Sequence, residues 1–301
     1  MFDKNLIVYF NGEYKKLGDA SISPMTHGLH YGTGVFEGIR AYKIKDGVGI
    51  FRLNEHTDRL FYSAEKLGLD ISQTKGEINE ACLELMRKNN LESAYVRPLV
   101  FFDDSALGMK IGNNKTNVFI AAFDWPKYLA DEVNVKISPF TRISEKSTVC
   151  DAKIAGHYTN SWLASSQAKQ DGVDEPLLLD HAGAIAEGPV ANVFFVSDKK
   201  LITPQKGKIL AGITRDSVME LARDLGYEII EKEIFSEELK SFQGAFFTGT
   251  ASEITPIKKI ILDSGEEVVF DAITVSKLQN AFSDVISEES KDDKKWFTML
   301  K

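Results

Sequence analysis

Residues 176–204 read PLLLDHAGAIAEGPVANVFFVSDKKLITP, and this stretch separates two classes of fold. Its apolar runs alternate with turn-forming residues, which predicts strand, turn and strand in direct succession. A doubly wound sheet would instead place a helix after each strand. The expected fold class is therefore mixed α/β, or α+β, in which strands outnumber a regular strand–helix alternation.

Helices and strands are expected along the rest of the chain. Ile7–Phe10 and Glu13–Leu17 predict a β-hairpin, because the Asn11-Gly12 pair between them favours a two-residue hairpin turn. Asn54 stands where a helix N-cap belongs, and Gly68 stands where that helix ends. Strands are also expected over 34–51, 94–102, 117–123, 133–138 and 244–248, and helices over 78–86, 155–170, 214–225 and 273–286.

The length of 301 residues suits two domains. Residues 124–128 carry a proline between polar flanks, and the pattern of strands and helices restarts after them. We therefore expect an N-terminal α/β domain over 1–123, an interdomain loop over 124–135 and a C-terminal α/β domain over 136–301.

Composition argues against several classes of function. A net charge of −8 disfavours a general binder of nucleic acid or of an anionic membrane. The only cysteines, Cys82 and Cys150, are too few for a disulfide framework, and the five histidines show no metal-ligand spacing, so no metal is expected. No apolar run approaches the ~18 residues of a membrane span. A cytoplasmic location is expected.

Two glycine-containing segments could approach a ligand. In Tyr31–Gly38 the third glycine comes one position late for a dinucleotide fingerprint, and a strand pattern follows, so its glycines indicate a bend in a sheet or a close approach to a ligand. Gly212-Ile213-Thr214-Arg215-Asp216 leads into a helix, with Thr214 as the candidate cap. The free N–H groups of such a helix start favour a phosphate. The strand end Thr248–Ala251 adds hydroxyls and a permissive glycine.

Lys153 has small or apolar neighbours in the segment CDAKIAG, residues 150–156. Loss of hydration there would favour the neutral amine, which is the nucleophile that Schiff-base chemistry requires. Composition alone favours an ordinary surface lysine, so further context is needed.

That context comes from a resemblance that spans nearly the whole chain. Its ordered motifs resemble those of the class IV aminotransferases, pyridoxal 5′-phosphate (PLP) enzymes of fold type IV, and among them the branched-chain aminotransferases. The resemblance implies a two-domain fold like that of D-amino-acid aminotransferase. The motifs are Tyr9–Glu13, His30–Arg40, Phe51-Arg52, Glu55-His56, Arg59-Leu60, Ala94–Leu99, Ala152-Lys153, Tyr158–Ser161, Ala186–Gly188 with Asn192, Gly212–Asp216, Thr248–Ala251 and Glu253–Pro256.

The resemblance implies a role for each residue around the cofactor. Lys153 would be the catalytic lysine, which carries PLP covalently and then moves a proton. Glu187 would face the pyridine nitrogen, and Tyr158 would bind the 3-hydroxyl group. The full set implied to bind PLP is Arg59, Lys153, Tyr158, Glu187, Leu210, Ile213, Thr214 and Thr250, of which Arg59, Ile213, Thr214 and Thr250 match the phosphate cup.

The same resemblance implies a substrate pocket and a homodimer or higher homo-oligomer. Aromatic walls suit an aliphatic side chain, while Arg97, Tyr95 and the turn at Gly249 would bind carboxylates. A loop of the partner subunit would close the pocket, and residues 107–109 occupy that place. The implied substrate set is Tyr31, Phe36, Gly38, Tyr95, Arg97, Leu107, Met109, Trp125, Tyr128, Gly249, Thr250 and Ala251.

The expected reaction is transamination between L-leucine, L-isoleucine or L-valine and 2-oxoglutarate. The alternatives are another class IV enzyme, namely a D-amino-acid or (R)-amine transaminase or aminodeoxychorismate lyase, and a non-catalytic binder of small molecules. One position departs from the family pattern: Ala191 stands where an acidic residue usually precedes Asn192, which alters the polarity near Glu187.

Overall fold

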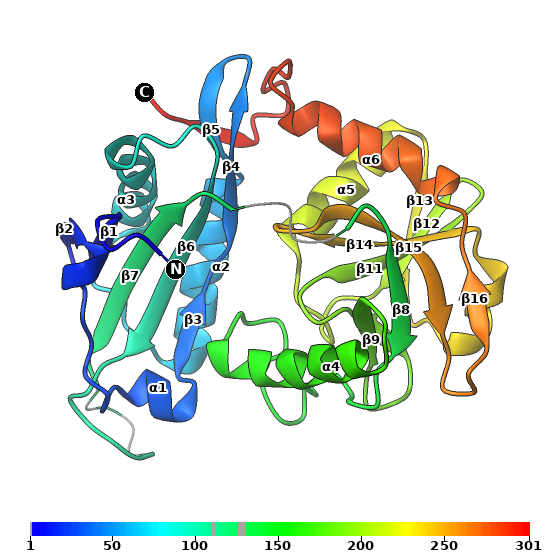
Figure 1. Ribbon diagram of the computed structural model, residues 1–301, viewed down its shortest axis with the longest axis horizontal. Coiled ribbons are helices and arrows are strands. Elements are labelled where there is room, and N and C mark those ends of the chain that lie inside the picture. Colours follow the sequence, from blue (N-terminus) through cyan, green and yellow to red (C-terminus); the bar gives the residue numbers. More distant parts are fainter. Residues whose placement is uncertain (1, 110–111, 113, 126–129) are drawn as a thin grey trace. The chain divides into compact units, whose positions relative to one another are not determined.

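The computed structural model describes residues 2–109, 112, 114–125 and 130–301 (Figure 1). The chain divides into two compact units. Unit 1 comprises Met1–Pro126, Ala152–His157 and Ile286–Lys301, and unit 2 comprises Lys127–Asp151 and Tyr158–Val285. None of the helices described is long and apolar enough to cross a membrane.

Unit 1 is built on an eight-stranded sheet, counted over the described residues. Its order is β17-β5-β4-β6-β7-β1-β2, with β3 also paired to β6. Asn11 and Gly12 both have positive φ, 50° and 94°, so the predicted hairpin is confirmed. The strands are β1 (Ile7–Phe10), β2 (Glu13–Lys16), β3 (Gly34–Phe36), β4 (Ile39–Ile44), β5 (Gly47–Phe51), β6 (Ala94–Phe102), β7 (Thr116–Phe123) and β17 (Phe297–Met299).

Two amphipathic helices pack on this sheet. Helix α2 (Leu53–Leu67) packs on β3, and helix α3 (Lys75–Lys88) packs on β1 and β7. Gly68 ends α2 in the left-handed conformation, as predicted, but Arg52 and not Asn54 is the N-cap. The reason is tertiary: the Arg52 N–H donates to the Trp296 carbonyl at 2.6 Å, and the helix begins two residues earlier than predicted. Short elements in this unit are η1 (Leu17–Asp19) and α1 (His27–Tyr31).

Two segments of unit 1 come from beyond residue 135, whereas the sequence placed both in the C-terminal domain. Strand β17 pairs with β5, with Phe297 opposite Phe51, because Trp296 and Phe297 bury their rings against that strand. Residues 152–157 join β3 through a bridge between Val35 and Ile154. The expected loop 124–135 is also shorter than predicted, since β8 (Val133–Ile137) starts inside it.

Unit 2 contains a ring of strands. The order β10-β9-β8-β15-β14-β11 closes because β10 also pairs with β11. Strands β12, β13 and β16 extend this sheet. The bounds are β9 (Glu175–Leu179), β10 (Ile185–Glu187), β11 (Asn192–Ser197), β12 (Lys200–Pro204), β13 (Glu228–Lys232), β14 (Gly244–Gly249), β15 (Glu253–Ile261) and β16 (Glu267–Val269). The succession of strands expected over 176–204 is therefore confirmed.

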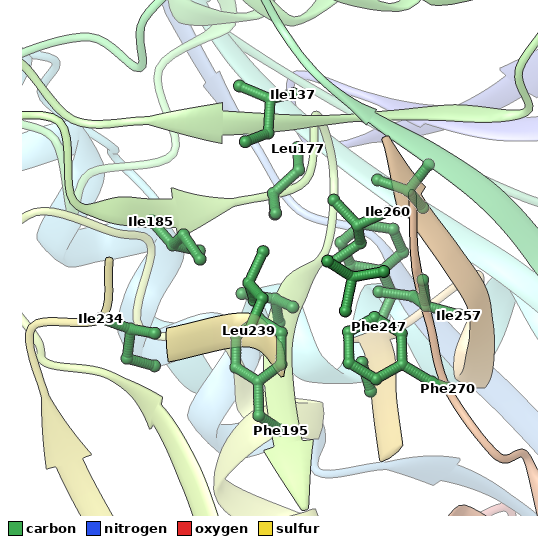
Figure 2. Packing of buried hydrophobic residues seen from close by; sticks show 14 of the residues in the cluster. Ile137, Leu177, Ile185, Phe195, Ile234, Leu239, Phe247, Ile257, Ile260 and Phe270 are labelled. Carbon is green, nitrogen blue, oxygen red and sulfur yellow. The ribbon is translucent and has the colours of Figure 1, made fainter. Parts of the chain in front are cut away.

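Buried aliphatic and aromatic side chains fill the core of unit 2. Figure 2 shows Ile137 and Leu177 from β8 and β9 gathered with Phe195, Phe247 and Phe270. Each fully buried side chain of this size contributes roughly 1.5–3 kcal/mol relative to an exposed one. The core therefore holds the ring together and fixes the strand ends that carry polar residues.

Helices flank this sheet. Helix α4 (Tyr158–Gln170), which follows η2 (Ala155–His157), packs on β9, and helix α5 (Ile213–Asp224) packs on β13 and β14. The sequence predicted one helix over 155–170, but its first turn is a 3₁₀ turn that belongs to unit 1. The remaining elements are η3 (Ser236–Ser241) and α6 (Ile273–Ile286), and α6 has the bounds predicted.

Candidate active site

Lys153 is fixed by its backbone in unit 1. Its N–H donates to the Ser63 hydroxyl at 2.9 Å, and its carbonyl accepts from the Phe36 N–H at 3.2 Å. The Lys153 amine lies 4.7 Å from the centroid of the Phe36 ring. The cation–π distance is short enough for a favourable contact. Lys153 therefore presents a half-buried amine against an aromatic face.

Arg97 lies against the same ring. Its guanidinium carbon is 4.7 Å from the Phe36 centroid and 5.1 Å from the Tyr95 centroid, and its Nη2 donates to the Tyr95 hydroxyl at 2.9 Å. A Cβ on Gly38 would lie 1.9 Å from that hydroxyl, so glycine is required there. The Trp125 ring lies 5.3 Å from Tyr95. The structure thus groups Lys153 with five of the residues expected to bind substrate.

Three residues next to Tyr95 carry a buried hydrogen-bond donor: Arg40 pairs with Tyr95 in the sheet, Arg97 bonds its hydroxyl and Trp125 packs on its ring. Among the described residues, Arg97 Nε, Arg40 Nε and Trp125 Nε1 are buried and donate to nothing. Each lone buried donor costs roughly 1–3 kcal/mol unless an acceptor arrives. All three groups are donors, so only an acceptor could satisfy them.

Tyr31, Leu107 and Met109 form an exposed apolar group in unit 1. Leu107 and Met109 are 49% and 74% exposed, and Tyr31 is 39% exposed at the end of α1. Buried His27 connects these residues, because its Nε2 donates to the Gly108 carbonyl at 2.9 Å and its ring lies 4.5 Å from the Tyr31 ring. Tyr128, also expected to bind substrate, lies outside the described residues.

Arg59 is held by a buried carboxylate. Its Nε and Nη2 donate to Glu37 Oε1 and Oε2 at 2.7 and 2.8 Å, and His56 Nδ1 donates to Oε2 at 2.7 Å. Burial alone would raise the pKa of the Glu37 carboxyl, but the neighbouring Arg59 and His56 hold that pKa well below its usual range. Burial in turn lowers the pKa of His56, which favours its neutral form. Of Glu37, His56 and Arg59, only Arg59 is therefore a cation near neutral pH.

Glu187 lies in unit 2, on β10, where its pairing with Asn192 of β11 closes the ring of strands. It stands opposite Asn192, whose amide donates to Glu187 Oε2 at 3.0 Å. Arg142 Nε donates to Oε1 at 2.5 Å, and the Leu210 N–H donates to Oε2 at 3.2 Å. Charge-assisted bonds of this kind are stronger than neutral ones. Glu187 is only 5% exposed, and these donors hold its buried carboxylate in one orientation.

Asn192 also connects Glu187 to the start of α5. Its amide donates to the Leu210 carbonyl at 2.9 Å, and its Oδ1 would lie 2.0 Å from a Cβ on Gly212. Gly212 is the N-cap of α5, so the prediction that Thr214 caps this helix is wrong. Glycine occupies that position because only a residue without a side chain leaves room for Asn192. Ile213 and buried Thr214 form the first turn, whose N–H groups favour an anion.

Ala191, which stands where the family pattern has an acidic residue, packs in the apolar core of unit 2. Ala191 is 8% exposed and belongs to the apolar cluster inside the ring, whereas Asn192 is the residue that reaches Glu187. On the neighbouring strand Thr248 stands opposite Asn192, and the turn of Gly249, Thr250 and Ala251 follows it. Thr248 Oγ1 is buried and, among the described residues, has no hydrogen-bond partner. Tyr158 begins α4.

Sequence reasoning gave no role to Arg142, His27, His56 or Glu37. Arg142 lies in a polar loop without a helical or strand pattern, so nothing local distinguishes it from an exposed arginine. His27 and Glu37 lie beside glycines and are themselves buried, and a partner far along the chain is what makes each of them specific.

The chain belongs to the class IV aminotransferases. The model of that family, "Amino-transferase class IV", matches residues 34–260. The branched-chain-amino-acid aminotransferase of Pseudomonas aeruginosa is 39% identical over 308 residues, covering 100% of this chain and 99% of that protein. The protein of the same name from Escherichia coli K12 is 38% identical over 300 residues, covering 97% of each chain.

Solved structures agree in fold. A crystal structure of the Escherichia coli branched-chain amino acid aminotransferase matches with a TM-score of 0.92 and 37% identity over 99% of this chain and 100% of that one. The branched-chain amino acid aminotransferase from Thermobaculum terrenum, in its PLP-containing holo form, matches with a TM-score of 0.87 and 32% identity over 99% of this chain and 100% of that one. The fold is the mixed α/β fold type IV expected from the sequence.

Proposed function

We propose that this protein transfers the amino group between branched-chain L-amino acids and 2-oxoglutarate with PLP as cofactor. The observation that carries this proposal is the position of Arg97 between the Phe36 and Tyr95 rings, with the Lys153 amine against the same Phe36 ring. The aromatic faces would contact the side chains of leucine, isoleucine and valine, while the guanidinium would donate hydrogen bonds to the second carboxylate of glutamate. One pocket would thus accommodate both kinds of amino donor.

The residues present fit PLP. When bound, PLP supplies an electron sink for the pair of electrons left on the substrate carbon as its proton departs. Lys153 would bind the aldehyde carbon, Glu187 would hold a proton on the pyridine nitrogen, and Tyr158 would orient the 3-hydroxyl group. Arg59, with Ile213 and Thr214 at the start of α5 and with Thr250, would bind the phosphate. Leu210 would lie against the ring.

The chain's own groups would then handle the proton and the two carboxylates. Once released as a free amine, Lys153 would take the proton from the substrate α-carbon and return it to the cofactor side. The Tyr95 hydroxyl and the N–H groups of the Gly249–Ala251 turn would bind the α-carboxylate. Arg97 would bind the side-chain carboxylate of glutamate, which would otherwise be costly to bury unpaired.

The test is a panel of amino donors with 2-oxoglutarate. L-leucine, L-isoleucine and L-valine should all serve, with modest differences, because a methylene in an apolar pocket is worth only about 1–3 kcal/mol. D-alanine and simple amines should be poor donors. Rapid turnover of D-alanine, or of an (R)-amine, would assign the chain to another class IV activity.

We also propose a homodimer as the smallest active form. The support is the exposed pair Leu107 and Met109, anchored by His27, which would close the pocket of a partner subunit. Sedimentation at assay concentrations should show a dimer or larger assembly, and a fully active monomer would refute the idea.

A cytoplasmic location is proposed because the free thiols Cys82 and Cys150 suit a reducing compartment.

A further inference from the structure

We propose that Glu37, assisted by His56, is a positioning residue that holds the Arg59 guanidinium in the orientation that binds a phosphate group. Neither residue has a role in the function proposed above, although both lie in the motifs from which it was inferred. The inference rests on that function, in which Arg59 binds the phosphate of PLP.

The contact between Glu37 and Arg59 is a two-point fork. Two parallel bonds of 2.7 and 2.8 Å join Arg59 Nε and Nη2 to the two carboxylate oxygens. A fork fixes the plane and the rotation of a guanidinium, whereas a single bond would leave both free. The third bond, from His56 Nδ1 at 2.7 Å, prevents the carboxylate itself from turning.

The base of this arrangement is rigid. Glu37 is 0% exposed, and its backbone N–H donates to the Pro98 carbonyl of β6 at 2.9 Å. His56 is 1% exposed and lies on α2, as does Arg59. The fork therefore ties the helix that carries Arg59 to the sheet that carries Tyr95 and Arg97. An unsupported arginine side chain would lose rotamer entropy on binding, and this support removes much of that cost beforehand.

Three consecutive residues then have three separate tasks. Phe36 lies against the Lys153 amine and the Arg97 guanidinium, Glu37 holds Arg59, and Gly38 leaves room for the Tyr95 hydroxyl. Because Phe36, Glu37 and Gly38 are adjacent, a shift of this segment would disturb both the support of the Lys153 amine and that of Arg59, the residue proposed to bind the phosphate.

The charge of Glu37 and its positioning of Arg59 have opposite effects on phosphate binding. The negative Glu37 weakens the attraction of Arg59 for a phosphate dianion, so a variant that keeps the charge and moves the carboxylate isolates the positional effect. Glu37→Asp is that variant, because it retracts the same carboxylate by one methylene. Glu37→Gln is its counterpart, because it keeps the shape and removes the charge.

The measurement is the dissociation constant of the apoenzyme for PLP and for pyridoxal, which lacks the phosphate. The ratio of the two constants isolates phosphate recognition from any general loss of fold. We expect Glu37→Asp to reduce the preference for PLP by about tenfold or more, since a charge-assisted bond to Arg59 is lost or bent. His56→Leu should reduce it less, and His56→Asn, whose amide can replace Nδ1, should keep it near that of the unaltered protein.

Met86→Ala is the matched control, because Met86 is fully buried on α3 and outside the expected site. It should lower the melting temperature of the apoenzyme and leave the ratio unchanged. In an Arg59→Met background, Glu37→Asp should have no further effect on the ratio, because Glu37 acts only through Arg59.

Two results would overturn the inference: an unchanged ratio in Glu37→Asp, or an equal further loss in the Arg59→Met background. If Glu37→Gln raised the preference for PLP while Glu37→Asp left it intact, Glu37 would be a counter-ion and not a positioning residue. Failure of the proposed function is a different result, namely an unaltered protein that binds PLP no better than pyridoxal.

Discussion

Glu175 offers a test of the electrostatics of unit 2 that is independent of the active site. It is the first residue of β9, is 8% exposed, and has one carboxylate oxygen, Oε2, buried without a hydrogen-bond partner among the described residues. Burial, assisted by the nearby negative charge of Asp174, raises the pKa of Glu175 to about 7 from an ordinary value of 4.5. The folded protein therefore keeps a proton that the unfolded chain releases.

The sign and the size follow from that difference. Between pH 4.5 and 7 the native state binds the proton more tightly than the unfolded state, so stability falls as the pH rises through this window and levels off above it. At about 1.4 kcal/mol per pKa unit, the full cost at about pH 8 is about 3 kcal/mol, against about 1 kcal/mol at about pH 5. Glu175→Gln, which cannot ionise, should lack this loss of about 2 kcal/mol between the two values.

The assay is urea unfolding of the unaltered protein and of Glu175→Gln at several values between about pH 5 and about pH 8. The difference in free energy of unfolding between the two should shift in favour of the variant as the pH rises. Glu237→Gln, at an exposed glutamate, is the control and should give a difference that does not depend on pH. If Glu175→Gln also gave a constant difference, Glu175 would not carry a raised pKa, and the reasoning would fail.

Three further predictions concern other parts of the molecule. Borohydride reduction of the enzyme with PLP, followed by peptide mapping, should place the label on Lys153; a label on another lysine would refute its role. Arg97→Ala should slow the half-reaction with glutamate far more than that with leucine in single-turnover measurements, whereas equal losses would assign Arg97 to the shared α-carboxylate. Trp296→Ala should reduce the free energy of unfolding by about 3–5 kcal/mol, because it removes a buried ring that packs on Phe51 and Arg52; a change below about 1 kcal/mol would show that β17 is dispensable.

Local patterns in the sequence were enough for much of the secondary structure. The Asn11-Gly12 turn, the end of α2 at Gly68 and the bounds of β6 and α6 all match, because turn geometry, capping and apolar spacing act over a few residues. The motifs were likewise sufficient for the family, since their order along the chain is itself specific.

Contacts between distant residues were decided only by the tertiary structure. The pairing of β17 with β5, the return of residues 152–157 to unit 1 and the closure of the ring at Glu187 depend on which apolar faces meet once the chain collapses. The same is true of the polar clusters. Arg142 lies 45 positions from Glu187, and Arg59 lies 22 from Glu37. No short-range pattern encodes such a pair, because the energy that selects it is the cost of leaving a buried charge without its partner.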